Sequence, residues 1–118
     1  MTDQDPHGLD AHEPGAKLDR GKNRLGLVLG GFSDALVAVG QVGTYGANKY
    51  SDSGWKAVLH GEGRYMDAAL RHMLAHLGGE RRDPESGLEH MAHAAWNLLA
   101  VLQFMQDRGG DATQPEAP

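Results

Sequence analysis

Two helix-forming segments, residues 64–77 and 88–106, are joined by a short polar link, and this pairing constrains the fold more than any other feature of the sequence. Apolar residues recur at helical spacing in both segments, which indicates two amphipathic helices. Gly78-Gly79 is typical of a helix C-cap. Two such helices form a helical hairpin whose apolar stripes face a core. The predicted core residues are Met66, Leu70, Met73, Leu74 and Leu77 in the first helix and Leu88, Met91, Ala95, Leu98, Leu99 and Leu102 in the second.

A third helix is expected from Ser33 or Asp34 to about Tyr50, because Gly30-Gly31 breaks the chain and either residue can cap a helix. One face of it carries small residues, including Gly40, Gly43 and Ala47, which would let another helix approach closely. Before the break, residues 25–29 are predicted to form a short strand or turn. The expected fold is therefore all-α, a small bundle of about three main helices that is completed by oligomerisation.

The length of 118 residues and the hydrophobic content of 40% suit one small domain, which we place at residues 17–108. Residues 1–16 and 109–118 lack apolar periodicity and are predicted to be a flexible arm and tail. No apolar run approaches the length of a membrane span and no secretory signal is evident, so a cytoplasmic protein without a membrane partner is expected. The net charge of −5 argues against binding to a nucleic acid polymer. The absence of cysteine excludes disulfides and thiolate metal sites.

The second helix of the hairpin also carries a polar stripe, formed by His90, His93 and Asn97. At 100° per residue these side chains fall within about 60° of one another. Three carboxylates, Glu80, Asp83 and Glu85, precede that stripe in the link. A lone histidine is more often a hydrogen-bonded structural residue than a ligand, but the clustering with carboxylates favours a site. On the first helix, His72 and His76 could ligate a metal, and Asp67 and Arg71 could form a salt bridge.

Basic and aromatic residues nearer the N-terminus allow two interpretations each. Lys22 and Arg24 belong to a glycine-containing basic segment that could hold phosphates or could simply be solvated. Tyr45, Tyr50 and Trp55 could sandwich a nucleobase or could be ordinary core residues.

The order of these features resembles the phage dATP/dGTP diphosphohydrolases, a branch of the MazG-like all-α nucleotide pyrophosphohydrolases. The most specific part is the stretch DPESG-x-x-H-x-x-H-A at residues 83–94, and the resemblance covers about residues 17–102. Other resembling residues are Asp19, Gly21-Lys22, Arg24, Thr44-Tyr45-Gly46-Ala47, Lys49-Tyr50, Trp55, Arg64-Tyr65, Asp67-Ala68, Arg71-His72 and Gly79-Glu80.

This resemblance implies hydrolysis of dGTP or dATP to the monophosphate and pyrophosphate, with Mg²⁺ or Mn²⁺, in phage nucleotide metabolism and hence in the host cytoplasm. It also implies a homodimer or homotetramer. The implied catalytic residues are Glu80, Asp83, His90 and His93, and the implied metal ligands are Asp67, Glu80, Asp83 and Glu85. The implied substrate-binding residues are Lys22, Arg24, Tyr45, Lys49, Tyr50, Trp55, Arg71, His72 and Asn97.

The sequence departs from the MazG-like pattern at its acidic pairs. MazG-like enzymes usually carry E-x-x-E on one helix and E-x-x-D on a later one. Here no carboxylate lies between Asp34 and Asp52, and His90-x-x-His93 replaces the later pair. Either Asp67 and the link carboxylates rebuild the metal site, or the chain is a non-catalytic nucleotide-binding module. A purely structural helical assembly is the third alternative.

Overall fold

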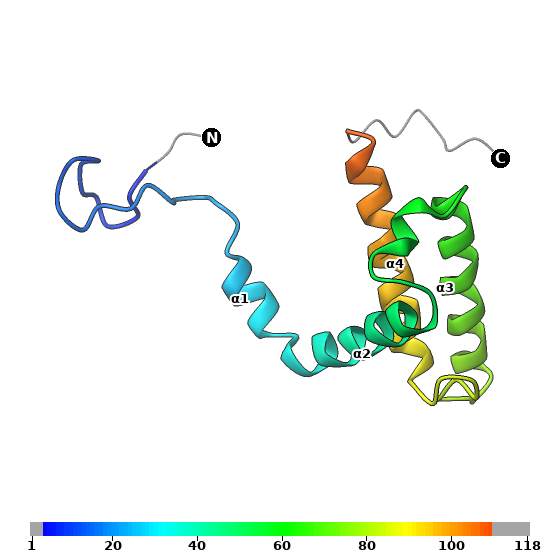
Figure 1. The fold of residues 1–118 in the computed structure, drawn as a ribbon. Helices are drawn as coiled ribbons and strands as arrows, with labels where there is room; N and C mark the ends of the chain where they lie inside the picture. The colour runs from blue at the N-terminus through cyan, green and yellow to red at the C-terminus, as the bar shows by residue number, and fades with distance from the viewer. Residues whose placement is uncertain (1–3, 110–118) are drawn as a thin grey trace. The chain divides into compact units, whose positions relative to one another are not determined.

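A computed structural model describes residues 4–109 as helices joined by loops, without a strand in that range. The elements are α1 (Leu25–Gly30), α2 (Ser33–Lys49), the 3-10 helix η1 (Gly54–Ala57), α3 (Gly61–Leu77) and α4 (His90–Asp107) (Figure 1). The predicted all-α class is therefore confirmed. The chain divides into two compact units, Met1–Phe32 and Ser33–Pro118. Except for Gly109, the predicted C-terminal tail lies outside the described residues.

The first unit contains a loop that closes around the carboxylate of Asp5. This carboxylate accepts hydrogen bonds from the backbone N–H of Lys17 at 2.8 Å and of His7 at 2.6 Å, and both lower the pKa of Asp5. The guanidinium of Arg20 donates to the carbonyls of Asp5 and Pro6 at 3.3 and 2.9 Å. The described part of the predicted arm thus folds back on itself.

The prediction of a short strand or turn at residues 25–29 was wrong, because this segment is helix α1. A strand needs a neighbouring strand to pair its backbone groups, whereas a helix satisfies them locally. Val28 N–H donates to the Arg24 carbonyl at 3.1 Å, and Gly31 N–H donates to the carbonyls of Leu27 and Val28, each at 3.3 Å. The apolar run therefore forms one short turn of helix that ends at the glycine pair.

In the second unit, α3 and α4 run side by side as the predicted hairpin, and α2 packs against α4 (Figure 1). The helices meet through small residues. Ala69 on α3 is fully buried, and a methyl group added at Gly61 would lie 2.6 Å from the Phe104 ring of α4. At Gly43 of α2, an added methyl group would lie 3.0 Å from Nε1 of Trp96. The predicted close approach along the small-residue face of α2 is therefore confirmed at Gly43.

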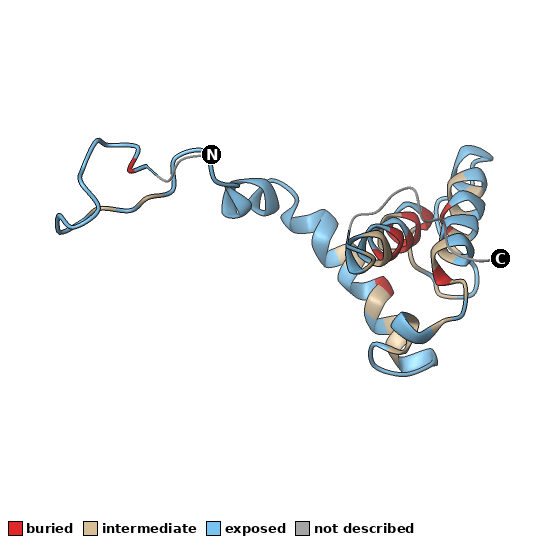
Figure 2. Ribbon diagram, turned by 90° about the horizontal axis from the view of Figure 1, so that it is seen from above, coloured by how far each residue is buried: buried red, intermediate tan, exposed pale blue. Residues whose placement is uncertain are grey.

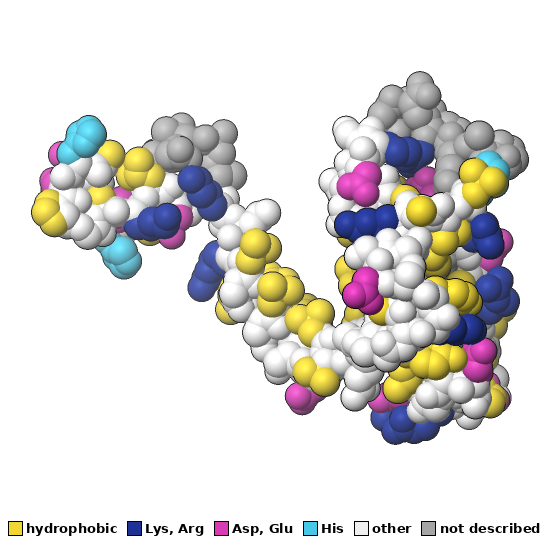
Figure 3. Space-filling view, in the orientation of Figure 1, with side chains coloured by type: hydrophobic (Ala, Val, Ile, Leu, Met, Phe, Trp, Pro, Cys, Tyr) yellow, Lys and Arg dark blue, Asp and Glu magenta, His cyan; other side chains and the backbone are white. Residues whose placement is uncertain are grey.

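The predicted core stripes of the hairpin were wrong for most of their large side chains, which face outward in a single copy of the chain, whereas Met73, Leu88 and Ala95 are half-buried. On α3 the exposed fractions are 38% for Met66, 46% for Leu70, 67% for Leu74 and 78% for Leu77. On α4 they are 47% for Met91, 40% for Leu98, 51% for Leu99 and 49% for Leu102. We call these two sets the apolar rows. Hydrophobic side chains accordingly reach the surface over the hairpin (Figure 3).

The buried face of α4 instead combines alanines and Val101 with the polar stripe (Figure 2). His90, His93 and Asn97 are only 4, 7 and 6% exposed. Alanine lets the helices approach closely, so larger side chains are displaced from the contact. The polar stripe is thus an interior feature of the hairpin.

The tight contact at Gly61 leads to a stability prediction. Replacing Gly61 with Ala should destabilise the fold by about 1–3 kcal/mol, because the new methyl group overlaps the Phe104 ring. Gly63→Ala is the matched control, since nothing lies within 4 Å of a methyl group there. That control should stabilise α3 by about 0.5–1 kcal/mol, because alanine is the better helix former. Urea unfolding of both variants measures the difference, and equal effects would contradict the packing described here.

Candidate functional site

The link between α3 and α4 folds into a tight turn that its own sequence encodes. The Asp83 carbonyl accepts a hydrogen bond from Gly87 N–H at 2.7 Å, and Gly87 has a φ of 74°, which glycine adopts without strain. Asp83 Oδ2 accepts a hydrogen bond from Ser86 N–H at 3.3 Å. Asp83 N–H donates to the Leu88 carbonyl at 2.8 Å, and His90 N–H donates to the Arg81 carbonyl at 2.9 Å. These bonds hold the link against the first turn of α4.

One hydrogen-bonded chain runs from the link through α4 to α3. Nε2 of His90 lies 2.7 Å from Oε1 of Glu80, and Nδ1 of His90 lies 2.8 Å from Nδ1 of His72. An ionised carboxylate only accepts, so Nε2 of His90 carries a hydrogen. In the hydrogen bond between the two Nδ1 atoms, the donor depends on the tautomer of each ring.

A second chain joins Asp83, Ser86 and His93. The Ser86 hydroxyl lies 3.0 Å from Oδ2 of Asp83 and 2.7 Å from Nε2 of His93, and it accepts a hydrogen bond from Leu88 N–H at 3.1 Å. Because the ionised carboxylate must accept, the hydroxyl donates to Asp83 and accepts from Nε2–H of His93. The neutral His93 ring therefore keeps its lone pair on Nδ1.

The two chains meet where the rings of His72 and His93 stack, with centroids 4.4 Å apart and planes 7° apart. Burial lowers the pKa of His72, and the neighbouring imidazoles His93 and His90 lower it further. Burial likewise lowers the pKa of His93, against the opposing influence of Asp83. Both rings are therefore neutral at pH 7. Partial burial raises the pKa of Asp83, but hydrogen bonds from Ser86 outweigh that effect, so the net change is downward.

We call Glu80, His90, His72, Asp83, Ser86 and His93 the histidine–carboxylate cluster. Asn97 supports it from one turn further along α4, where its side-chain N–H donates to the His93 carbonyl at 2.8 Å. Tyr45 of α2 packs its ring edge-on against His93 at 6.3 Å between centroids. All three long helices therefore contribute to the site.

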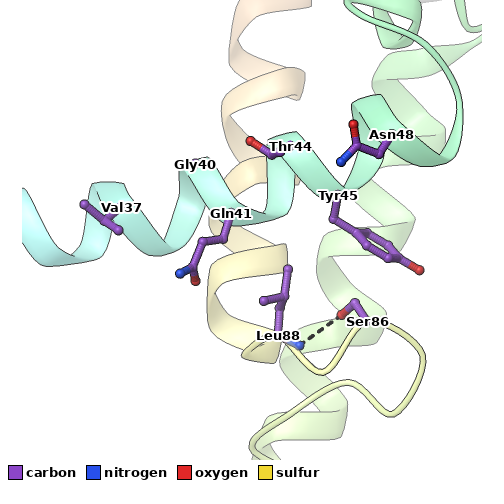
Figure 4. Close-up of a pocket in the computed structure, with 8 residues that line it drawn as sticks. All are labelled: Val37, Gly40, Gln41, Thr44, Tyr45, Asn48, Ser86 and Leu88. Atoms are coloured by element: carbon purple, nitrogen blue, oxygen red, sulfur yellow. Dashed lines mark hydrogen bonds between the residues drawn. The ribbon is translucent and has the colours of Figure 1, made fainter.

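An open surface depression of about 580 Å³, which we call the cavity, adjoins the cluster between α2 and the link (Figure 4). Ser86 and Tyr45 belong to both features, since they line the cavity and contact His93. Gln41 and Tyr45 extend from α2 toward Ser86 and Leu88 of the link (Figure 4). The lining residues are Val37, Gly40, Gln41, Thr44, Tyr45, Asn48, Ser86 and Leu88.

The structure does not bring every predicted site residue to the cluster. Trp55 packs with Tyr65, Trp96 and Phe104, at ring-centroid distances of 6.4, 5.6 and 5.5 Å. This half-buried aromatic group joins η1, α3 and α4. Trp55 is absent from the residues that line the cavity.

Charged residues predicted for the site lie mostly on the surface. Lys49 forms an ion pair with Glu85 at 2.9 Å and lies 5.3 Å from the ring centre of the exposed Tyr50. The hydrogen bond that the Lys49 ammonium donates to the Glu85 carboxylate raises the pKa of Lys49. Asp67 and Arg71 are exposed on α3. Lys22 and Arg24 belong to the first unit, so their predicted contact with phosphates stays a prediction.

The predicted metal ligands do not assemble in the part of the chain that the structure describes. Within residues 4–109, no group of three or more His, Asp or Glu side chains could hold a metal ion. The Glu85 carboxylate is paired with Lys49, and both ring nitrogens of His90 already have partners. The described residues therefore do not fit a resident Mg²⁺ or Mn²⁺, and dependence on either ion stays a prediction.

Ser86 is the residue of the cluster that the sequence did not single out. A serine three residues after an aspartate is common in turns, where its N–H and hydroxyl bond to the carboxylate. Helical spacing could not have revealed it, because α4 begins only at His90 and the backbone at Glu89 is extended. The turn at residues 83–87 brings Ser86 to His93 instead.

The fold and the cluster define the class of this protein, an all-α domain with a buried site built from imidazoles and carboxylates. Comparison of sequences identifies the family. Residues 12–113 match the family described as dATP/dGTP diphosphohydrolase, N-terminal, and the chain belongs to this family. The resemblance inferred from the motif at residues 83–94 is therefore confirmed.

One similar protein is named dATP/dGTP diphosphohydrolase and comes from Salmonella phage PMBT28. It is 33% identical to this chain over 94 residues, which cover 80% of this chain and 31% of the relative. The chain thus spans about a third of the length of that relative. No solved structure matches the chain.

Proposed function

We propose that this domain hydrolyses purine deoxynucleoside triphosphates, dGTP or dATP, to the monophosphate and pyrophosphate. The observation that carries the proposal is the partly buried histidine–carboxylate cluster beside a cavity, in a chain of the dATP/dGTP diphosphohydrolase family. Two neutral imidazoles backed by carboxylates provide groups that can accept a proton near pH 7.

His93 is the proposed general base, since it contacts two residues that line the cavity. Water attacks the α-phosphorus, an O–P bond forms, and the bond from the α-phosphorus to the bridging oxygen breaks to release pyrophosphate. The proton of the water passes to the lone pair on Nδ1 of His93. Asp83 stabilises the resulting imidazolium, because its carboxylate lies 3.7 Å from Nε2 and is also linked to it through Ser86. This proton transfer does not depend on a metal held by the protein.

Incubation of the purified protein with dGTP and dATP tests the proposal. The expected products are the deoxynucleoside monophosphate and pyrophosphate in equal amounts, with Mg²⁺ or Mn²⁺ present. Because Mg²⁺ binds phosphate oxygens, EDTA should reduce the rate by removing the ion from the triphosphate itself. Ion-exchange chromatography separates the products. If neither triphosphate yields pyrophosphate with either ion, the enzymatic proposal fails.

A second candidate is a nucleotide-binding module without catalysis. One observation favours it: within residues 4–109, no group of three or more His, Asp or Glu side chains could hold a metal ion. Nucleotide binding that persists in EDTA, without product, would support this alternative over hydrolysis. A phage role and the cytoplasm as the place of action stay predictions. Among residues 4–109, no helix has the length and apolar character needed to cross a bilayer.

We also propose that a second copy of the chain covers the apolar rows. Each row presents four large hydrophobic side chains at 38–78% exposure on a helix of the hairpin. Large hydrophobic side chains exposed in such numbers on neighbouring helices are typical of protein contacts. The same rows on two copies could pack against each other around a two-fold axis, which needs no other partner. A homodimer, or a homotetramer built from two of them, follows from this arrangement.

A further inference from the structure

We propose that the cavity between α2 and the link binds the purine base of the nucleotide, and that Gln41 hydrogen-bonds to the edge of that base. This inference rests on the proposed function, which supplies a purine deoxynucleotide as the substrate. It assigns the cavity to the uncharged part of that substrate.

The chemistry of the lining selects the base over the phosphates. The cavity is lined by apolar side chains, hydroxyls and carboxamides, and its lining residues include no Lys, Arg, His, Asp or Glu. A triphosphate needs cations or a row of backbone N–H groups, and a metal ion needs carboxylates. A neutral, planar heterocycle with donors and acceptors on its edge needs neither. The volume of about 580 Å³ also falls in the usual range for small-molecule sites, about 300–1,000 Å³.

The arrangement of the lining gives a base both a flat surface and a polar edge. Tyr45 and Leu88 supply aromatic and apolar surface from opposite sides of the cavity, and Gln41 lies one helical turn before Tyr45. An aromatic ring can stack on any nucleobase. Stacking on Tyr45 would therefore add affinity without distinguishing one base from another. A base held against Tyr45 and Ser86 would also be adjacent to His93, because both residues contact that ring.

The carboxamide of Gln41 explains how one site would accept two purines. A carboxamide has an N–H₂ donor and a carbonyl acceptor, and it can rotate to exchange them. It can therefore match the acceptor N7 and donor N6 of adenine, or donate to the acceptors N7 and O6 of guanine. We accordingly expect similar affinities for deoxyadenosine and deoxyguanosine.

Gly40 makes the cavity testable without disturbing the fold. It lines the cavity, and nothing lies within 4 Å of a methyl group added there. A leucine at this position adds a large side chain to the lining of the cavity. Gly63→Leu is the matched control, because Gly63 is exposed on α3, has the same open surroundings and does not line the cavity. Gln41 is exposed as well, so Gln41→Leu removes the carboxamide without emptying the core.

Calorimetric titration with deoxyguanosine, deoxyadenosine and deoxythymidine, none of which carries phosphate, tests the assignment. Both purine nucleosides should bind the wild-type protein and the Gly63→Leu variant equally, and deoxythymidine should bind more weakly. Gly40→Leu should abolish purine binding, and Gln41→Leu should weaken it about tenfold, as expected for the loss of one well-formed hydrogen bond.

The inference is overturned if purine nucleosides do not bind, if deoxythymidine binds equally well, or if Gly40→Leu and Gln41→Leu bind purines like the wild type. Its failure can be distinguished from failure of the proposed function. If Gly40→Leu and Gln41→Leu both hydrolyse the triphosphate with the KM of the wild type, the base site is refuted and the proposed hydrolysis is not. If the wild-type protein binds purine nucleosides, Gly40→Leu abolishes that binding, and no triphosphate is hydrolysed, then the enzymatic proposal is refuted and the base site is not.

Discussion

Replacing His93 with Gln should lower kcat for dGTP hydrolysis by about 10²-fold to 10⁴-fold, the usual contribution of a general base. Glutamine has a similar volume and can still hydrogen-bond to Ser86, but it cannot accept the proton of the attacking water near pH 7. The Ser86–His93 contact of 2.7 Å and the nearby Asp83 carboxylate make this ring the best supported proton acceptor in the site. Measurement of kcat at pH 7.5 gives the effect directly.

His76→Gln is the matched control for that measurement. His76 lies one turn beyond His72 on α3 but is exposed and outside the cluster, so kcat should change little. Ser86→Ala provides a second test if the His93 variant unfolds, because it leaves the imidazole in place and removes its link to Asp83. A smaller loss, of about tenfold, is expected from that variant. Retention of wild-type kcat in folded His93→Gln protein would exclude His93 as the base.

Replacing Leu74 with Glu should convert the proposed dimer into monomers while leaving the fold of each copy intact. Leu74 is 67% exposed in a single copy, so the new carboxylate remains in water when the copies separate. In a dimer that buries the apolar rows, the carboxylate would lose water without gaining a partner. A penalty of about 3 kcal/mol or more is expected for such a buried charge. It would raise the dissociation constant at least about a hundredfold.

Sedimentation equilibrium of the wild type, Leu74→Glu and His76→Glu decides this prediction. His76→Glu adds the same side chain to an exposed position on α3 outside the apolar rows, so its molecular mass should match that of the wild type. A wild-type protein that stays monomeric at about 100 μM would show that the rows are not a contact between copies. If the wild type and Leu74→Glu have the same molecular mass in solution, the apolar rows are likewise not a contact between copies.

The helices were predictable from the sequence because their ends depend on local signals. α2 occupies Ser33–Lys49 as expected after the glycine pair, and α3 ends at Leu77 before Gly78. The start of α3 was placed too late, because His60 adopts a left-handed conformation with φ of 56° and the helix begins at Gly61. That conformation is unusual outside glycine and has no clear sequence signal.

The packing of the helices was harder to predict, because periodicity shows that a helix has an apolar face without showing what covers it. The leucines of α3 and α4 form genuine stripes, yet Ala69, Ala94 and Ala100 are the most buried hydrophobic residues of these helices in a single copy. A small side chain gives little signal in a hydrophobic pattern but permits the closest approach of two helices. Side-chain size therefore outweighed hydrophobicity in deciding which faces meet.

Part of the cluster was predictable because its members are close in sequence. Glu80, Asp83, His90 and His93 fall within fourteen positions, and a turn followed by a helix brings them together. The role of His72 as a bridge between the two chains depends on the pairing of α3 with α4, which spacing alone does not specify. Trp55 follows Tyr45 closely in sequence but packs against Trp96 and Phe104, a contact that spacing alone also does not specify.

The buried polar stripe of α4 has a consequence for how this domain could change under selection. Well-packed apolar side chains in place of buried polar groups often leave a protein as stable as before, or more so. Leucine-like replacements at His90, His93 and Asn97 would therefore be tolerated if thermal stability were the only requirement. A library selected solely for folding should lose these residues quickly, whereas one selected for nucleotide turnover should keep them. Comparing two such populations would separate what the hairpin needs to fold from what it needs to react.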